Sequence, residues 1–299
     1  IVITGNNNYI FFYKLKNIFP NKKFISIQNG FRNSQFFKNL KKKKNLKVDY
    51  VCGFNKSFCN LYKKYIKTKT ITTGSFRNND NKITKKVKKK SFLFISMGNP
   101  GSYKNVLTEG HKFKSDNFFK LDLKLLRIVS NYCLKKNITL TIFPKFTGKR
   151  GEREIKFFKN NFADKKIKYF KKNDSSAKNT KNQIYELADK NLLTLTTHSS
   201  FALENLARLN KTAIFNNKIK SSKNIMNILW NYNLPKKGFF WTNDSFDEKE
   251  VNRMLNNLSK MKNTLWKKKV KGIAKTLMIY DDQNESIIKL IKKFLRSNN

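Results

Sequence analysis

Acidic residues are scarce in this sequence, which has 19 Asp and Glu against 65 Lys and Arg and so a formal net charge of +46. A charge of this size attracts nucleic acid, anionic lipid and phosphate-bearing ligands. Arginine is scarce as well, at 8 of the 65 basic residues, although proteins that read nucleic acids rely on its forked hydrogen bonds. A/T-rich codons, which Lys shares with the abundant Asn, Ile and Phe, explain much of the lysine excess. The charge therefore favours an anionic small ligand or a membrane surface over nucleic acid.

Cysteine and histidine are too few for most disulfide or metal chemistry. The three cysteines, Cys52, Cys59 and Cys133, are odd in number and lack metal-ligand spacing, so we expect reduced thiols and a cytoplasmic setting. The two histidines, His111 and His198, have no metal-like neighbours, and the sequence has no zinc motif or catalytic-triad pattern. We therefore expect no metal site.

Long apolar runs are absent too. No stretch of about 18 uncharged apolar residues occurs, which argues against a membrane-spanning helix, and no secretory signal is visible. Apolar residues still make up 39% of the chain, which favours a folded core over disorder. The chain opens on IVIT, a strand-like sequence without an initiator Met, so we expect part of an N-terminal domain to precede it.

Short apolar runs alternate with amphipathic ones near the N-terminus, which predicts helical crossovers between parallel strands. The predicted strands are 1–4, 24–28, 50–54 and 70–73, and the predicted helices are 9–19 and 56–66. The polar, lysine-rich stretch 78–90 has no periodicity, and it fits either an interdomain linker or a solvated loop within one domain. We predict a partial N-terminal α/β domain at 1–78 and a linker at 79–90.

A second alternation begins at Ser91 and predicts a doubly wound α/β domain over 91–280. Its predicted strands are 92–97, 138–143, 167–170, 192–196 and 212–215, with helices around 121–132, 152–162, 184–189 and 201–209. The last residues, 281–299, predict an amphipathic helix with an apolar stripe formed by Ile287, Leu290, Ile291, Phe294 and Leu295. This stripe could pack back across the domain boundary or cover its own domain.

The most informative turn follows the predicted strand at 192–196. Small hydroxyl residues there open a helix, and the backbone N–H groups and dipole of a helix N-terminus favour an anion. His198, Ser199 and Ser200 would lie at this turn, and Glu204, on the same helix face, could accept hydrogen bonds from a ribose. Equally, one of the serines could be a simple N-cap, and Glu204 could pair with the arginine four residues on.

Two further loops follow predicted strands, at the edge where ligands bind in open α/β sheets. Gly98, in the sequence MGNPG, would let a ligand approach the backbone closely, although such a loop is more often a plain turn. Lys145 and Arg150 follow the next strand and could neutralise a diphosphate, or belong to a solvated basic loop. With the turn at His198, these residues predict a central crevice for a phosphate-bearing, nucleotide-type ligand.

A general base is harder to place. His111 and Glu109 lie on the loop after MGNPG, and we take them as the catalytic candidates. His198, in the predicted crevice, is another candidate. A lone histidine, however, is more often structural than catalytic.

Four segments occur in the same order in a family of surface carbohydrate biosynthesis proteins: SIQNG (26–30), TTGSF (72–76), SSFALENLAR (199–208) and KKGFFWTN (236–243). The chain resembles this family over most of its length. The family is in turn similar to GT-B glycosyltransferases and is related to UDP-N-acetylglucosamine 2-epimerases. The resemblance implies two Rossmann-like domains with parallel sheets, which face each other across a cleft. The C-terminal domain would hold a nucleotide-sugar donor and the N-terminal domain would present the acceptor.

The resemblance also implies roles for single residues. Ser199, Ser200 and Glu204 would be donor-site residues, and Lys145 and Arg150 correspond more loosely. Other family members carry Gly-Tyr-Glu where this chain has Ala-Leu-Glu, so the glutamate carries over better than its neighbours. The segment KKGFFWTN would line the cleft or belong to the core.

Together these features imply a cytoplasmic glycosyltransferase-like enzyme of surface polysaccharide or lipopolysaccharide biosynthesis. It would transfer a sugar from a nucleotide-sugar, which is a substrate rather than a cofactor, to a glycan or lipid-linked acceptor. Its basic surface could hold it at the anionic inner face of a membrane. Three alternatives stay open. One is epimerisation or hydrolysis of the nucleotide-sugar. A second is non-catalytic nucleic-acid binding, which would leave the crevice motifs without a purpose. A third is a degenerate, inactive member of the same family.

Overall fold

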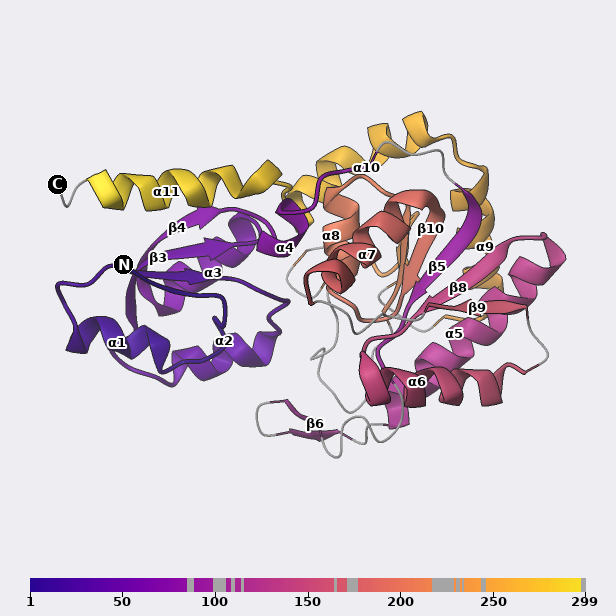
Figure 1. Ribbon diagram of the computed structural model, residues 1–299, viewed down its shortest axis with the longest axis horizontal. Coiled ribbons are helices and arrows are strands. Elements are labelled where there is room, and N and C mark those ends of the chain that lie inside the picture. The colour runs from indigo at the N-terminus through magenta and orange to yellow at the C-terminus, as the bar shows by residue number, and fades with distance from the viewer. Residues whose placement is uncertain are drawn as a thin grey trace.

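The computed structural model describes residues 1–84, 89–98, 106–108, 111–113, 116–163, 166–170, 177–216, 229, 232, 234–242 and 246–296. Two parallel sheets form the centres of two neighbouring bodies, which appear in violet and in magenta to orange in Figure 1. We call them the N-terminal sheet and the C-terminal sheet.

The N-terminal sheet has four parallel strands in the order β1-β2-β3-β4. Its strands are β1 (Val2–Thr4), β2 (Phe24–Ile27), β3 (Lys47–Gly53) and β4 (Lys67–Thr72). The helices between them are α1 (Phe12–Ile18), α2 (Ser34–Lys41) and α3 (Lys56–Tyr65). Asn33 and Asn55 begin α2 and α3 by accepting the backbone N–H three residues on, each at 2.9 Å. The predicted parallel sheet is confirmed, whereas α2 was not predicted.

The C-terminal sheet has six parallel strands in the order β12-β11-β10-β5-β8-β9. They are β5 (Lys89–Ile95), β8 (Thr139–Phe143), β9 (Ile167–Tyr169), β10 (Asn191–Thr196), β11 (Thr212–Phe215) and β12 (Trp241–Thr242). The chain builds outward from β5 through β8 and β9, then returns to the other side of β5 with β10. The sheet is therefore doubly wound, as predicted, and its topological switch point lies between β5 and β10.

Helices pack against both faces of the C-terminal sheet (Figure 1). They are α5 (Asp116–Lys135), α6 (Gly148–Asn161), α7 (Ala177–Lys190), α8 (Phe201–Ala207), α9 (Glu248–Lys260) and α10 (Asn263–Leu277). A small antiparallel hairpin, β6 (Val106–Thr108) and β7 (His111–Phe113), lies apart from both sheets. Within the described parts of the chain, no helix is long and apolar enough to cross a membrane.

The last helix, α11 (Glu285–Arg296), packs on the N-terminal sheet rather than on its nearer neighbours in the sequence. Three apolar residues of α11 are buried against β2 and β3. They are Ile287, Leu290 and Phe294, and they pack with Ile25 and Ile27 of β2 and with Cys52 of β3. The Phe294 ring meets the ring of Tyr50 edge-on, with 5.5 Å between centroids. Of the two alternatives left open for the apolar stripe, the structure selects packing back across to the first body.

The aromatic residues of KKGFFWTN belong to the core. Phe240 and Trp241 are buried, and the ring of half-buried Phe239 lies 5.8 Å from the ring of Trp266 on α10. Glycine at position 238 is required there, because a Cβ would meet the Trp241 ring at 2.3 Å. The aromatic residues of this segment therefore fix the edge strand β12.

Candidate functional site

A cavity of about 360 Å³ lies where β5, β8 and β10 end. The loops after these strands supply most of its walls, including Ser96 and Met97, Lys145, and the run His198–Ser200. Phe31, from the loop between β2 and α2, adds a wall from the N-terminal sheet. The cavity thus lies at the switch point between β5 and β10, where open α/β sheets bind their ligands, and it faces the body formed around the N-terminal sheet.

Four of the predicted site residues come together in this cavity. Lys145 is exposed, His198 is buried, and Ser199 and Ser200 are half-buried, and all four belong to its lining. Strand ends of a parallel sheet share one edge, so loops that are far apart in the sequence meet there. With Ser96, the cavity therefore combines one ammonium group, one imidazole and three hydroxyls with apolar walls, which suits a polar, anionic ligand.

Gly98 shapes the cavity without lining it. Its φ of +107° is strained for any residue with a side chain, and a Cβ there would meet Cε2 of Phe146 at 2.9 Å. Its N–H donates to Oγ of Ser96 at 2.9 Å. Gly98 thus turns the chain sharply after Met97. Arg150 lies on α6 with its guanidinium 5.6 Å from the centroid of the Phe146 ring, and it is not part of the lining.

The turn that opens α8 uses most of its backbone donors internally. The N–H of Ser199 donates to Oγ1 of Thr196 at 3.2 Å, and the N–H of Phe201 donates to Oγ of Ser199 at 3.3 Å. The next two N–H groups donate to the carbonyls of Ser199 and Ser200. An anion in the cavity would therefore meet serine hydroxyls rather than the open row of N–H groups that the sequence predicted.

Glu204 does not line the cavity. Its Oε1 accepts from the hydroxyl of Ser75 at 2.6 Å, and its Oε2 accepts from the hydroxyl of Tyr185 at 2.8 Å. Burial raises the pKa of Glu204 above its ordinary value. Because Ser75 follows β4 and Glu204 lies on α8, this carboxylate joins the two bodies. Its contact with a ribose stays a prediction that this geometry does not favour.

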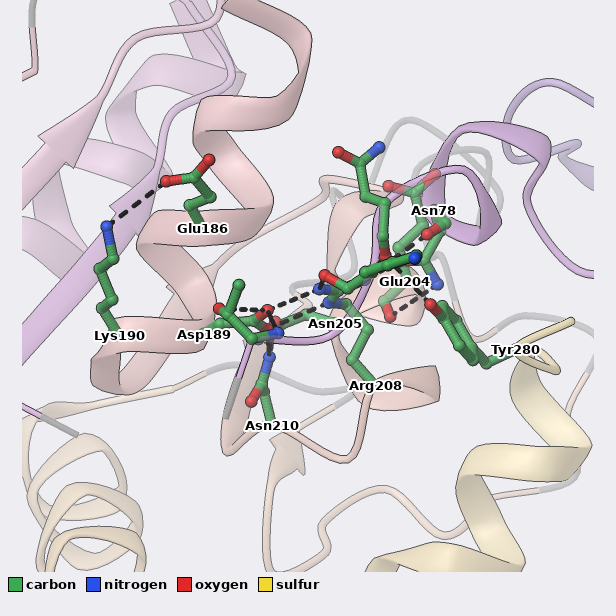
Figure 2. A network of polar contacts seen from close by, with 12 residues as sticks. Asn78, Glu186, Asp189, Lys190, Glu204, Asn205, Arg208, Asn210 and Tyr280 are labelled. Carbon is green, nitrogen blue, oxygen red and sulfur yellow. Dashed lines mark hydrogen bonds and ion pairs between the residues drawn. The ribbon is translucent and has the colours of Figure 1, made fainter. Parts of the chain in front are cut away.

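Arg208 does not pair with Glu204 either (Figure 2). Its Nη2 lies 2.5 Å from Oδ2 of Asp189, and both side chains are fully buried. The guanidinium also donates to the carbonyls of Asn81 and Lys82, at 2.7 and 3.0 Å. Burial alone would raise the pKa of Asp189, but the hydrogen bonds from Arg208 and from the Thr84 N–H keep it below its ordinary value. This pair fastens the start of the predicted linker to the C-terminal body.

Of the two catalytic candidates, the structure describes only the backbone position of His111. His111 begins β7 and lies opposite Thr108 of β6 in the hairpin register. Glu109 lies outside the described residues. Their catalytic assignment therefore stays a prediction. Among the residues that the structure does describe, no cluster of three or more His, Cys, Asp or Glu could hold a metal ion.

Two buried carboxylates behind the cavity were missed by the sequence analysis. Asp122 on α5 accepts from the Met97 N–H at 3.0 Å and from the Thr197 hydroxyl at 2.5 Å. Glu154 on α6 accepts from the Lys145 N–H at 3.0 Å. Burial raises the pKa of Asp122 to about 7. The available signal was an acidic residue on the apolar face of a helix, since leucines lie three and four positions after Asp122.

Comparison with known proteins identifies a family and a fold. The profile of the O-antigen biosynthesis protein family matches residues 25–295. The wall teichoic acid polymerase TagF, in a structure soaked with CDPG, superposes with a TM-score of 0.52 at 12% identity, over 93% of this chain and 69% of that one. S. aureus MnaA, in a co-structure with UDP, superposes with a TM-score of 0.51 at 12% identity, over 95% of this chain and 70% of that one. Curated protein sequences give no significant match. The fold is GT-B, as the family resemblance implied.

Proposed function

Since this chain belongs to the O-antigen biosynthesis protein family, we propose that it is a glycosyltransferase that takes a sugar from a nucleotide-sugar donor and adds it to a surface polysaccharide or lipopolysaccharide. The cavity at the β5–β10 switch point carries this proposal. It is of ligand size, it lies at the carboxyl edge of a doubly wound sheet, and it is walled on its far side by Phe31 of the other body.

The lining residues suggest how the donor would be held. Lys145 would offset the charge of the diphosphate, and the hydroxyls of Ser199 and Ser200 would donate to its oxygens. During transfer, negative charge develops on the leaving nucleotide, and the ammonium group of Lys145 would stabilise that charge. The acceptor would enter beside Phe31, from the side of the N-terminal sheet. The UDP and CDPG in the two related structures support a nucleotide as the ligand class.

A nucleotide titration tests the donor site. Calorimetry with UDP, CDP and GDP should show binding of at least one of them to the wild-type chain. Lys145→Ala should weaken that binding about tenfold, because it removes one charge-assisted contact to phosphate. Lys159→Ala is the matched control, since Lys159 is an exposed lysine of α6 outside the cavity lining. The donor site is refuted if the wild type binds none of the three nucleotides.

The reaction needs a separate experiment. Nucleotide-sugars matching the bound nucleotide should be incubated with and without a lipid-linked glycan acceptor, and the products analysed by mass spectrometry and NMR. Transfer predicts free nucleotide and a lengthened acceptor. A new sugar isomer formed without acceptor would instead identify epimerisation.

We also propose that the protein works in the cytoplasm, attached peripherally to the inner face of a membrane through its basic surface. The net charge of +46 supports this, because anionic lipids attract lysine-rich surfaces. Cosedimentation should occur with vesicles that contain phosphatidylserine and should weaken as salt rises. Equal binding to neutral vesicles would contradict an electrostatic attachment.

A further inference from the structure

The three loops that line the cavity are fixed from behind by two carboxylates that a ligand would not reach. Asp122 and Glu154 are each fully buried, and both accept backbone N–H groups of residues at the cavity wall. Asp122 belongs to α5 and Glu154 belongs to α6, so the wall is held by the helices that follow the strands rather than by the strands alone.

Asp122 joins two of these loops with a single side chain. Its Oδ2 accepts from the N–H of Met97, after β5, at 3.0 Å, and its Oδ1 accepts from the hydroxyl of Thr197, after β10, at 2.5 Å. Met97 lines the cavity, and Thr197 directly precedes the lining run that begins at His198. β5 and β10 are paired up to Ile95 and Thr196, and this carboxylate ties together the loops that follow them.

Glu154 orders the third loop. Both carboxylate oxygens lie 3.0 Å from the N–H of Lys145, and Oε2 also accepts from the N–H of Phe146 at 3.2 Å. The backbone from which the Lys145 side chain extends is therefore fixed, although its ammonium group is exposed. Phe146 in turn packs where a side chain on Gly98 would have to be. The two carboxylates thus act on adjoining parts of one wall.

We propose that Asp122 and Glu154 are positioning residues of the nucleotide site, which hold the loops after β5, β8 and β10 at the spacing that a nucleoside diphosphate requires. This inference rests on the proposed function. Neither carboxylate contacts the ligand. They act through Met97, Thr197 and Lys145, because misplacing a binding group by even a fraction of an ångström weakens its contacts.

Substitutions at Thr197 and Asp122 separate positioning from general stability. Thr197→Val keeps the shape of the side chain but removes its hydroxyl, and Asp122→Ala removes both acceptors. We expect each to weaken binding of UDP or CDP about tenfold. Thr197→Ser restores the hydroxyl. Asp122→Asn can still accept from Met97 and can donate its amide to Thr197. Both conservative variants should therefore stay within about threefold of the wild type.

Thr212→Val is the matched control. Thr212 is a fully buried threonine of the same sheet, outside the cavity lining, whose hydroxyl bonds with Asn205 and with the carbonyl of Asn210. This variant should lose stability but keep its nucleotide affinity. All dissociation constants should be measured by calorimetry well below each variant's melting temperature. If Asp122→Ala does not fold, the comparison of Thr197→Val with Thr197→Ser decides.

The outcomes are distinct. The positioning role is supported if Thr197→Val binds nucleotide more weakly, Thr197→Ser recovers the affinity, and Thr212→Val keeps the affinity of the wild type. The positioning proposal is overturned if Thr197→Val binds nucleotide as tightly as Thr212→Val does. The proposed donor site would stand in that case. A wild-type chain that binds no nucleotide overturns both proposals together.

Discussion

Asp122 binds a proton more tightly in the folded chain than in the unfolded one, because burial raises its pKa from 3.8 to about 7. Between these two values the folded state carries more protons, so the contribution of Asp122 to stability is complete below pH 3.8 and is lost as the pH rises toward 7. The folded protein is thus more stable with Asp122 protonated than with Asp122 ionised. The ionised carboxylate, in turn, is the form that accepts hydrogen bonds from both the Met97 N–H and the Thr197 hydroxyl.

Replacing Asp122 by Asn should therefore flatten the pH dependence of stability. We expect the free energy of unfolding of Asp122→Asn to rise relative to that of the wild type between pH 4 and 8, by up to about 4 kcal/mol. Urea unfolding across this range measures the difference. Glu186→Gln, at an exposed glutamate of α7, is the control and should show no such trend. A pH-independent difference for Asp122→Asn would refute the raised pKa.

Substitution by alanine should change stability in opposite directions at two glycines, Gly98 and Gly272. Gly98→Ala places a Cβ 2.9 Å from the Phe146 ring at a φ of +107°, so we expect a loss of about 1–3 kcal/mol in stability. Gly272→Ala adds a Cβ on α10 with no atom within 4 Å, so we expect a gain of about 0.5–1 kcal/mol from helix propensity. Thermal unfolding of both variants checks the pair. Equal effects would mean that the loop after β5 relaxes freely.

At the scale of the element, α11 is a helix with one face buried against the N-terminal sheet and the other exposed. Phe294 packs on Tyr50, whereas Ile288 on the same helix is 44% exposed. We expect Phe294→Ala to cost about 3 kcal/mol, and Ile288→Ala less than about 0.5 kcal/mol. Denaturant unfolding measures both. Similar losses would show that α11 does not stabilise the N-terminal sheet.

Local patterns in the sequence predict most of the strands and several helices, because buried parallel strands are short apolar runs between polar segments. The same patterns fail for α2. Its apolar residues, Phe36, Phe37 and Leu40, form too short a stripe to stand out from the lysines that follow. They also could not decide where the stripe of α11 packs, because an apolar face specifies burial and not the partner.

Some residues of the candidate site could also be predicted from local sequence patterns, and others could not. Lys145, His198, Ser199 and Ser200 were predictable, because loops after parallel strands meet at one edge whatever their distance in the sequence. Glu204 was assigned to that edge but contacts Ser75, which lies 129 residues away. The bond between Asp122 and the Thr197 hydroxyl spans 75 residues. Such pairs follow from tertiary packing, and no local spacing encodes them.

On the scale of the whole molecule, the contact between Glu204 and Ser75 joins the two bodies, and a double-mutant cycle measures its strength. Ser75→Ala and Glu204→Ala, each of which removes the hydrogen bond between the two side chains, should each lower the free energy of unfolding. The double variant should lose less than the sum, with a coupling of about 1–2 kcal/mol. Additive losses would refute the contact. Phe76→Ala, at an exposed residue next to Ser75, is the control.

Nucleotide affinity in the same variants decides the second role predicted for Glu204. A structural contact alone predicts that Ser75→Ala and Glu204→Ala bind nucleotide with the same affinity. A loss of affinity confined to Glu204→Ala would instead support a contact between Glu204 and a ribose.

The position of α11 has a consequence for how the chain is made. The N-terminal sheet is synthesised before the C-terminal sheet, yet one of its faces stays uncovered until residues 285–296 have been synthesised. Isoleucines of β2 remain open to other chains during that interval. A stop codon shortly before α11 would leave this face uncovered permanently and would yield a product prone to aggregate.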